Sequence, residues 1–158
     1  MTYELWPDDV VKLRRILVDL LSQSEADSCL LCDQAGHVLA HEDVSSGTDP
    51  LPVSALGAGV FAATRELARL LGEDEFSTVL HQGLERSILI CSANEEVLLV
   101  VLFSGEERTG LIKLYAPASA KAVRGVFADI TVRGAKGPAS VDRNFVLKDS
   151  GSIFGGNQ

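Results

Sequence analysis

Three cysteines and three histidines are the residues of this chain that could bind a metal or carry redox chemistry. Cys29 and Cys32 form a C-x-x-C pair, a spacing found in zinc sites and in redox-active thiols. The surrounding SCLLCD reads as a buried strand, in which side chains three residues apart point to opposite faces. We therefore expect Cys29, Cys32 and also Cys91 to be small core residues without a metal.

His37 and His41 lie four residues apart in a second candidate strand, so their side chains would share one face and could form a pair of metal ligands. No Cys, Asp or Glu at a convincing ligand spacing accompanies them, and His81 is remote in sequence. The favoured interpretation is solvated or capped histidines.

Motifs for nucleophilic or phosphate chemistry are missing from the sequence. The serines beside Gly105 and Gly151 lack the G-x-S-x-G framing of a nucleophile elbow. Gly57-Ala58-Gly59 has no third glycine and lies at a helix start, unlike a dinucleotide-binding loop. We expect no catalytic residue and no cofactor, so the chain does not read as an enzyme.

Composition restricts the classes of partner. The 158 residues carry a formal net charge of −8 and 46% hydrophobic side chains, which fits one domain with a sizeable core. The negative charge disfavours nucleic acids and anionic membranes. The longest apolar run, Val97–Phe103, is too short to span a membrane, and the first residues do not resemble a signal peptide. An odd number of cysteines favours a reducing compartment, so we expect a cytoplasmic protein.

Apolar periodicity predicts three helices and five strands in the order α-β-β-α-β-β-β-α, an α+β fold with one antiparallel sheet. The first helix is expected to be capped by Asp8 or Asp9, and the second to run from Pro52 to about Leu71 with Gly72 as its C-terminal cap. The third is expected to be capped by Thr109 and to be kinked or broken at Pro117. The expected strands are 28–32, 37–40, 76–81, 87–92 and 97–103. We expect residues 1–133 to form the domain and 134–158, poor in apolar residues, to form a flexible tail.

The second helix has one regular apolar side and one unusual side. A helical wheel predicts a core-facing stripe of Leu56, Val60, Ala63, Leu67, Leu70 and Leu71. The opposite side would then be exposed although it is rich in small residues, which suits close approach of a partner. This candidate partner-binding surface consists of Ala58, Gly59, Phe61, Ala62, Arg65, Glu66 and Arg69.

The strand after this helix could join two copies of the chain. It is apolar, and its late position in the order of strands favours a sheet edge with unpaired backbone groups. Antiparallel pairing with a symmetry mate would close that edge and set the two second helices side by side. The candidate dimerisation residues are Phe76, Ser77, Thr78, Val79, Leu80 and His81.

Over residues 8 to 130 the sequence resembles the roadblock / dynein light chain family, and within it the bacterial MglB-like proteins. The resemblance rests on the order and spacing of short segments: Gly57-Ala58-Gly59 with Ala62-Ala63, residues 67–73, Glu75-Phe76, His81-Gln82-Gly83 with Ser87, residues 97–103, and Gly110-Leu111-Ile112. It implies an α/β/α sandwich and a homodimer with a continuous sheet.

The same resemblance implies a partner. MglB-like proteins regulate a Ras-like, MglA-type GTPase, and the family implies one GTPase docked on the paired second helices of each dimer. Arg65 or Arg69 could act as an arginine finger, but a rigid helix reaches poorly into a nucleotide pocket, so we favour remodelling of the GTPase's switch loops. The alternative is a roadblock scaffold that binds a GTPase without stimulating hydrolysis. Ile153-Phe154 in the tail is either a docking motif or a remnant.

Overall fold

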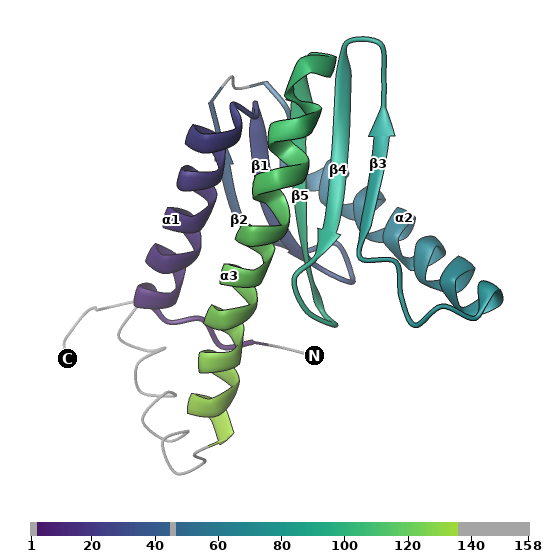
Figure 1. Cartoon of the computed structure of the whole chain (residues 1–158). Coiled ribbons are helices and arrows are strands. Elements are labelled where there is room, and N and C mark those ends of the chain that lie inside the picture. Colours follow the sequence, from purple (N-terminus) through teal and green to yellow (C-terminus); the bar gives the residue numbers. More distant parts are fainter. Residues whose placement is uncertain (1–2, 45–46, 136–158) are drawn as a thin grey trace.

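The protein is described by a computed structural model that covers residues 3–44 and 47–135. Five antiparallel strands form one sheet in the order β2-β1-β5-β4-β3, with α1 and α3 on one face and α2 on the other (Figure 1). The elements are α1 (Pro7–Ser24), β1 (Ser28–Asp33), β2 (Val38–Asp43), α2 (Pro50–Leu71), β3 (Thr78–Gln82), β4 (Arg86–Ser92), β5 (Val97–Ser104), a short 3-10 helix (Glu106–Arg108) and α3 (Thr109–Ala135). This order and the antiparallel sheet confirm the predicted fold.

The helix starts differ from the prediction because other groups occupy the capping positions. Trp6 is the N-cap of α1, and the carboxylate of Asp9, three residues further on, accepts a hydrogen bond from the Trp6 backbone N–H at 2.8 Å. In α2 the cap is Asp49, which accepts from the Leu51 backbone N–H at 3.1 Å. At the other end Gly72 adopts a left-handed conformation with φ of 77°, as its expected role as the C-terminal cap requires.

The third helix is longer than the sequence indicates. It runs through Pro117 without a break, so of the expected kink or break the break is wrong. Thr109 is the first residue of α3 and not its N-cap, and within the described part of the chain its hydroxyl has no hydrogen-bond partner. Gly134 and Ala135, which the sequence assigns to the tail, still belong to α3. The remainder of the predicted tail, including Ile153-Phe154, lies outside the described residues.

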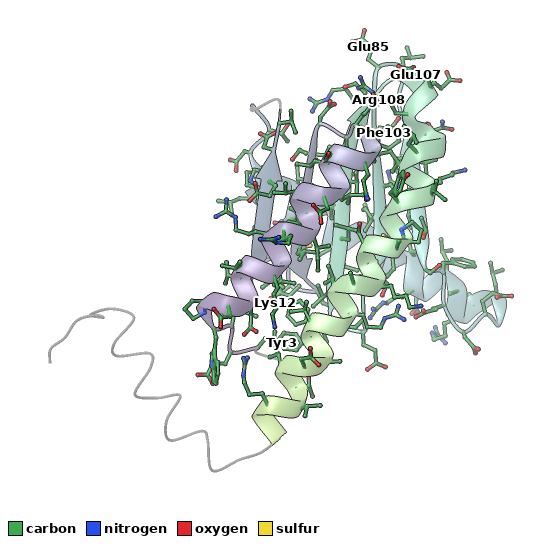
Figure 2. All side chains as sticks on the ribbon, turned by 60° about the vertical axis from the view of Figure 1, so that its left-hand side comes forward. Tyr3, Lys12, Glu85, Phe103, Glu107 and Arg108 are labelled. Atoms are coloured by element: carbon green, nitrogen blue, oxygen red, sulfur yellow. The ribbon has the colours of Figure 1, made fainter. Side chains whose placement is uncertain are left out.

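The two faces of the sheet carry cores of different size. Twenty-one buried residues form the core beneath α1 and α3, whereas seven form the core beneath α2. Figure 2 shows α1 and α3 side by side over the larger core. β5 lies at the centre of the sheet and is buried on both faces, which explains its uninterrupted run of apolar residues.

An ion pair joins the start of α1 to the end of α3. Arg133 donates to the Asp9 carboxylate at 2.9 Å, and its guanidinium stacks 3.7 Å from the centre of the Trp6 ring. Burial acts to raise the pKa of Asp9, but the hydrogen bonds from Arg133 and from the Trp6 backbone outweigh it and leave the pKa below its ordinary value. Close by, Tyr3 packs edge-on against Phe127 (Figure 2 labels Tyr3).

None of the helices described, over residues 3–44 and 47–135, has the length and apolar character required to cross a membrane.

Candidate functional site

The face of α2 that packs on the sheet is the opposite of the one that the helical wheel selects. The residues buried against the sheet are Ser54, Gly57, Ala58, Phe61, Thr64 and Ala68. Phe61 is 1% exposed and fills the smaller core, while the small side chains beside it let the helix approach the strands closely. The predicted core stripe is therefore wrong: Leu56, Leu67, Leu70 and Leu71 are 55–72% exposed.

This reversal divides the predicted partner-binding residues into two groups. Ala58 and Phe61 lie inside the smaller core, so they support the helix from behind and offer no surface. Gly59, Ala62, Glu66 and Arg69 are exposed, and Arg65 is half-buried at the edge of the packed face.

The exposed face of α2 consists of two adjacent strips. We call the first the leucine strip, formed by Leu56, Ala63, Leu67, Leu70 and Leu71; Val60, next to it, is half-buried and packs against the smaller core. We call the second the platform strip, formed by Gly59, Ala62, Glu66 and Arg69. The first is an apolar surface of the kind that marks a protein interface, and the second combines small side chains with a charged pair.

Both arginines of α2 are already engaged within the chain. The Arg65 guanidinium donates to the Glu95 backbone carbonyl at 3.0 Å and lies 5.4 Å from the centre of the Phe61 ring. Arg69 donates to the Glu66 carboxylate, one helical turn earlier, at 3.0 Å. Arg65 thus ties α2 to the turn between β4 and β5, and neither guanidinium is extended away from the helix surface.

The two edges of the sheet differ in their protection. β2 carries His41, Glu42 and Asp43, and Glu42 forms an ion pair with Arg14 of α1 at 2.6 Å. β3 is the other edge, as predicted, and its sequence TVLHQ holds no residue with a permanent charge. Charged side chains are the common means by which edge strands avoid pairing with other chains, so β3 is the edge that is open to pairing.

The candidate dimerisation residues occupy this edge and its approach. Thr78, Val79, Leu80 and His81 belong to β3, whereas Phe76 and Ser77 precede it. Ser77 nevertheless extends the sheet, because its carbonyl accepts a hydrogen bond from the Ser92 backbone N–H.

The residues considered for metal or redox chemistry are dispersed. Cys29 and Cys32 lie in different cores on opposite faces of the sheet, as expected, and burial raises the pKa of each thiol to about 12. The His37 Nδ1 atom lies within hydrogen-bonding distance of the Asp33 carboxylate, at 2.9 Å, and the His41 Nε2 atom lies 3.3 Å from the Ser28 hydroxyl. Among the residues described, no group of three or more potential ligands could hold a metal ion.

Comparison with protein families identifies the fold. The model of the Roadblock/LC7 domain matches residues 12–103, which extend from α1 to β5 and include both α2 and β3. The chain belongs to the Roadblock/LC7 domain family. A comparison with curated proteins found no match.

Among solved structures, this roadblock domain is similar to several MglB proteins. One, described as MglB with a tetrameric arrangement, is 29% identical with a TM-score of 0.77, and the match covers 82% of this chain and 97% of that one. The gliding protein MglB from Thermus thermophilus is 30% identical with a TM-score of 0.73, over 79% and 95% of the two chains. MglB of Myxococcus xanthus is 24% identical with a TM-score of 0.74, over 80% and 96%.

Sequence reasoning missed two parts of the surface. One is the exposure of the leucine strip, and the other is a groove of about 460 Å³ on the α2 side of the β3–β4 hairpin. It is lined by Thr48, Val53, His81, Gln82, Gly83, Arg86, Ser87, Ile88 and Leu102. Gly57 gave only a weak signal. It faces Ile90 and Val100 of the sheet, but a Cβ at this position would make ordinary contacts of 3.6 and 3.8 Å with them.

Proposed function

We propose that this roadblock protein is a GTPase-activating regulator of a small Ras-like, MglA-type GTPase, and that it acts as a homodimer. The observation that carries the proposal is the combination of an uncharged edge strand with a helix whose outer face holds leucines and small residues, in a fold of the MglB type. Such surfaces are typical of interfaces with protein partners. We further propose a cytoplasmic location, which the odd number of cysteines favours, and, on the family resemblance, a role in cell polarity or motility.

The proposed homodimer forms through β3. Pairing of this strand with its symmetry mate would satisfy the open backbone groups and continue the sheet from one copy into the next. The two α2 helices would then lie on the same face of the joined sheet, because a twofold axis perpendicular to the sheet keeps each helix on its own side. One GTPase would bind to this pair of helices.

The proposed docking surface is the platform strip together with Arg65. Gly59 and Ala62 have no side chain beyond Cβ, so a partner's backbone can approach the helix closely there. Glu66 and Arg69 provide a charged pair at the same level. Ala58 and Phe61 support this strip from within the core.

The contacts that Arg65 and Arg69 make within the chain favour remodelling of the GTPase's switch loops over an arginine finger. A finger must enter the nucleotide pocket of its partner and stabilise the charge of the transition state. Arg65 would first have to leave the Glu95 carbonyl and the Phe61 ring, and Arg69 would have to leave Glu66. We therefore propose that the dimer aligns the GTPase's own catalytic residues by holding its switch loops.

Phosphate release from a Ras-like GTPase of the same genome tests this function. We expect single-turnover hydrolysis to accelerate when the protein is added. Binding without acceleration would instead establish the second candidate, a roadblock scaffold, and no binding would refute both.

The Arg65→Ala variant separates the two modes of activation. Under remodelling it should weaken binding of the GTPase more than it lowers the hydrolysis rate at saturating activator. Loss of an arginine finger would lower that saturated rate by about 10³-fold or more. Arg124→Ala is the matched control, since Arg124 also donates to a carbonyl of the β4–β5 turn, at Ala93, but from α3 on the other face.

A further inference from the structure

The outer side of α1 carries a groove that lies apart from α2 and from the β3 edge. Its volume is about 410 Å³, and the described residues that line it are Val11, Arg14, Arg15, Val18 and Asp19. Val11 and Val18 lie two helical turns apart and are 58% and 48% exposed. Because α1 covers the face of the sheet opposite α2, the groove is separate from the platform strip (Figure 1).

This groove is basic although the chain has a net charge of −8. Arg14 forms an ion pair with Glu42 of β2. Arg15 lies one helical turn from both Val11 and Val18, and within the described part of the chain its guanidinium has no hydrogen bond or ion pair. An exposed guanidinium between two exposed valines fits a segment that presents a carboxylate next to apolar side chains.

The chain itself continues next to this groove. α3 runs antiparallel to α1, and the ion pair between Arg133 and Asp9 joins the last turn of α3 to the first turn of α1 (Figure 1). Residues 136–158 follow directly after this point. Arg15 lies about 9 Å further along α1 than Asp9, at 1.5 Å per residue, whereas residues 136–141 can span about 20 Å when extended. The groove is therefore within reach of the residues that follow α3.

One segment after α3 has the composition that the groove requires. The segment 142–149, DRNFVLKD, carries two acidic and two apolar residues at the i, i+3, i+4, i+7 spacing of one helix face. They are Asp142, Phe145, Val146 and Asp149. Ser140 before them and Gly151 after them are residue types that often cap the two ends of a helix. The sequence of this segment therefore favours a short helix with an apolar centre and a carboxylate at each end.

We propose that residues 142–149 dock as a helix in the groove on α1 of the same chain, with Phe145 against Val18 and the Asp142 carboxylate paired with the Arg15 guanidinium. The direction of the chain sets this order. A segment that comes from the end of α3 and runs along α1 brings residue 142 to the level of Arg15 first, and residue 145 follows one turn later at the level of Val18. For these residues the docked helix replaces the flexible tail that composition predicts.

Charge selects this register over the other one that brings apolar side chains together. With Phe145 at the level of Val11, Asp142 would lie at the level of Asp8, and the two carboxylates would repel each other. The docked segment would cover the basic side of α1 and leave the platform strip on the other face of the sheet free. The inference therefore depends neither on the homodimer nor on the GTPase.

Hydrogen–deuterium exchange of the full-length protein tests the docking. The amides of a docked helix exchange when the helix opens, so those of residues 142–149 should exchange at least about 10-fold more slowly in the wild type than in Val18→Glu. Leu114→Glu, on the exposed side of α3, is the matched control and should leave these rates unchanged. Equal rates in the wild type and in Val18→Glu would overturn the proposal.

An exchange of charges tests the ion pair and the register. Arg15→Asp sets two carboxylates against each other and Asp142→Arg sets two guanidiniums against each other, so each variant should speed the exchange of residues 142–149 several-fold. The double variant restores opposite charges and should recover the slow exchange of the wild type. Fast exchange that persists in the double variant would contradict the pairing of Arg15 with Asp142.

Discussion

The two sides of α2 are both apolar, but only one of them packs on the sheet. The side that faces the sheet is made of small residues around Phe61 and is complete within one chain. The side that faces away holds the larger leucines, which the rest of the described chain leaves more than half exposed. The comparison teaches that the most apolar stripe of a helix need not be the one that faces its own sheet.

The buried side should give the largest effect on stability. Phe61→Ala leaves a cavity in a core of only seven buried residues, and we expect a loss of about 3–5 kcal/mol in the free energy of unfolding. Denaturant unfolding measures this loss. It should be the same at low and high protein concentration, because the contact lies within one chain.

The ion pair between Asp9 of α1 and Arg133 of α3 provides a second effect on stability that arises within one chain. Arg133→Ala leaves the nearly buried Asp9 carboxylate without its partner and should cost about 2 kcal/mol at neutral pH. Because the folded pKa of Asp9 lies below its ordinary value of 3.8, this contribution is present above that value and is lost as the pH falls through the folded pKa. Unfolding at pH 7 and near pH 3 checks this, and a difference between wild type and variant that persists undiminished in acid would contradict it.

The outward side should show its effect only when copies associate. Leu67→Ala should change the stability of the dilute protein by less than about 0.5 kcal/mol, as surface substitutions do. At high concentration it should lower the melting temperature, since association stabilises the wild type by mass action. A loss of equal size at all concentrations would show that Leu67 belongs to the fold of one chain.

Substitution of the two glycines of α2 should have the smallest effects on stability, and it compares the exposed side of the helix with the buried side. A methyl group at Gly59 meets no atom within 4 Å, so Gly59→Ala should stabilise the helix by up to about 1 kcal/mol. The same methyl would stand between the platform strip and a closely docked GTPase and should weaken binding. Gly57→Ala is the control: its methyl would meet Ile90 at an ordinary 3.6 Å on the buried side, so GTPase affinity should stay the same.

The sequence specified most of the fold and less of the site. The sequence predicts that strand 76–81 lies at a sheet edge, and β3 (Thr78–Gln82) does. The two-residue period of a strand predicts that Cys29 and Cys32 face opposite sides of the sheet, which they do. The sequence predicts one helix over residues 109–133 with a kink or a break at Pro117. The helix is not broken there, because packing along a whole helix can outweigh one lost hydrogen bond.

The orientation of α2 could not be obtained from its sequence by periodicity alone. Both of its sides are apolar, and the rule that the more apolar side faces the core assumes that the chain has no partner. Only the packing of Phe61 in a shallow core, with Gly57 against the strands, decides between the sides. The hydrogen bond of Arg65 to the Glu95 carbonyl likewise joins α2 to a turn 30 residues away in the sequence, and no local pattern predicts such a contact.

The stoichiometry of GTPase binding tests the central claim most directly. The full-length protein is titrated calorimetrically with a Ras-like GTPase of the same genome, loaded with a non-hydrolysable GTP analogue. A platform built from the two α2 helices of a dimer should bind one GTPase for every two chains. One GTPase for each chain, or no binding at all, would contradict the account.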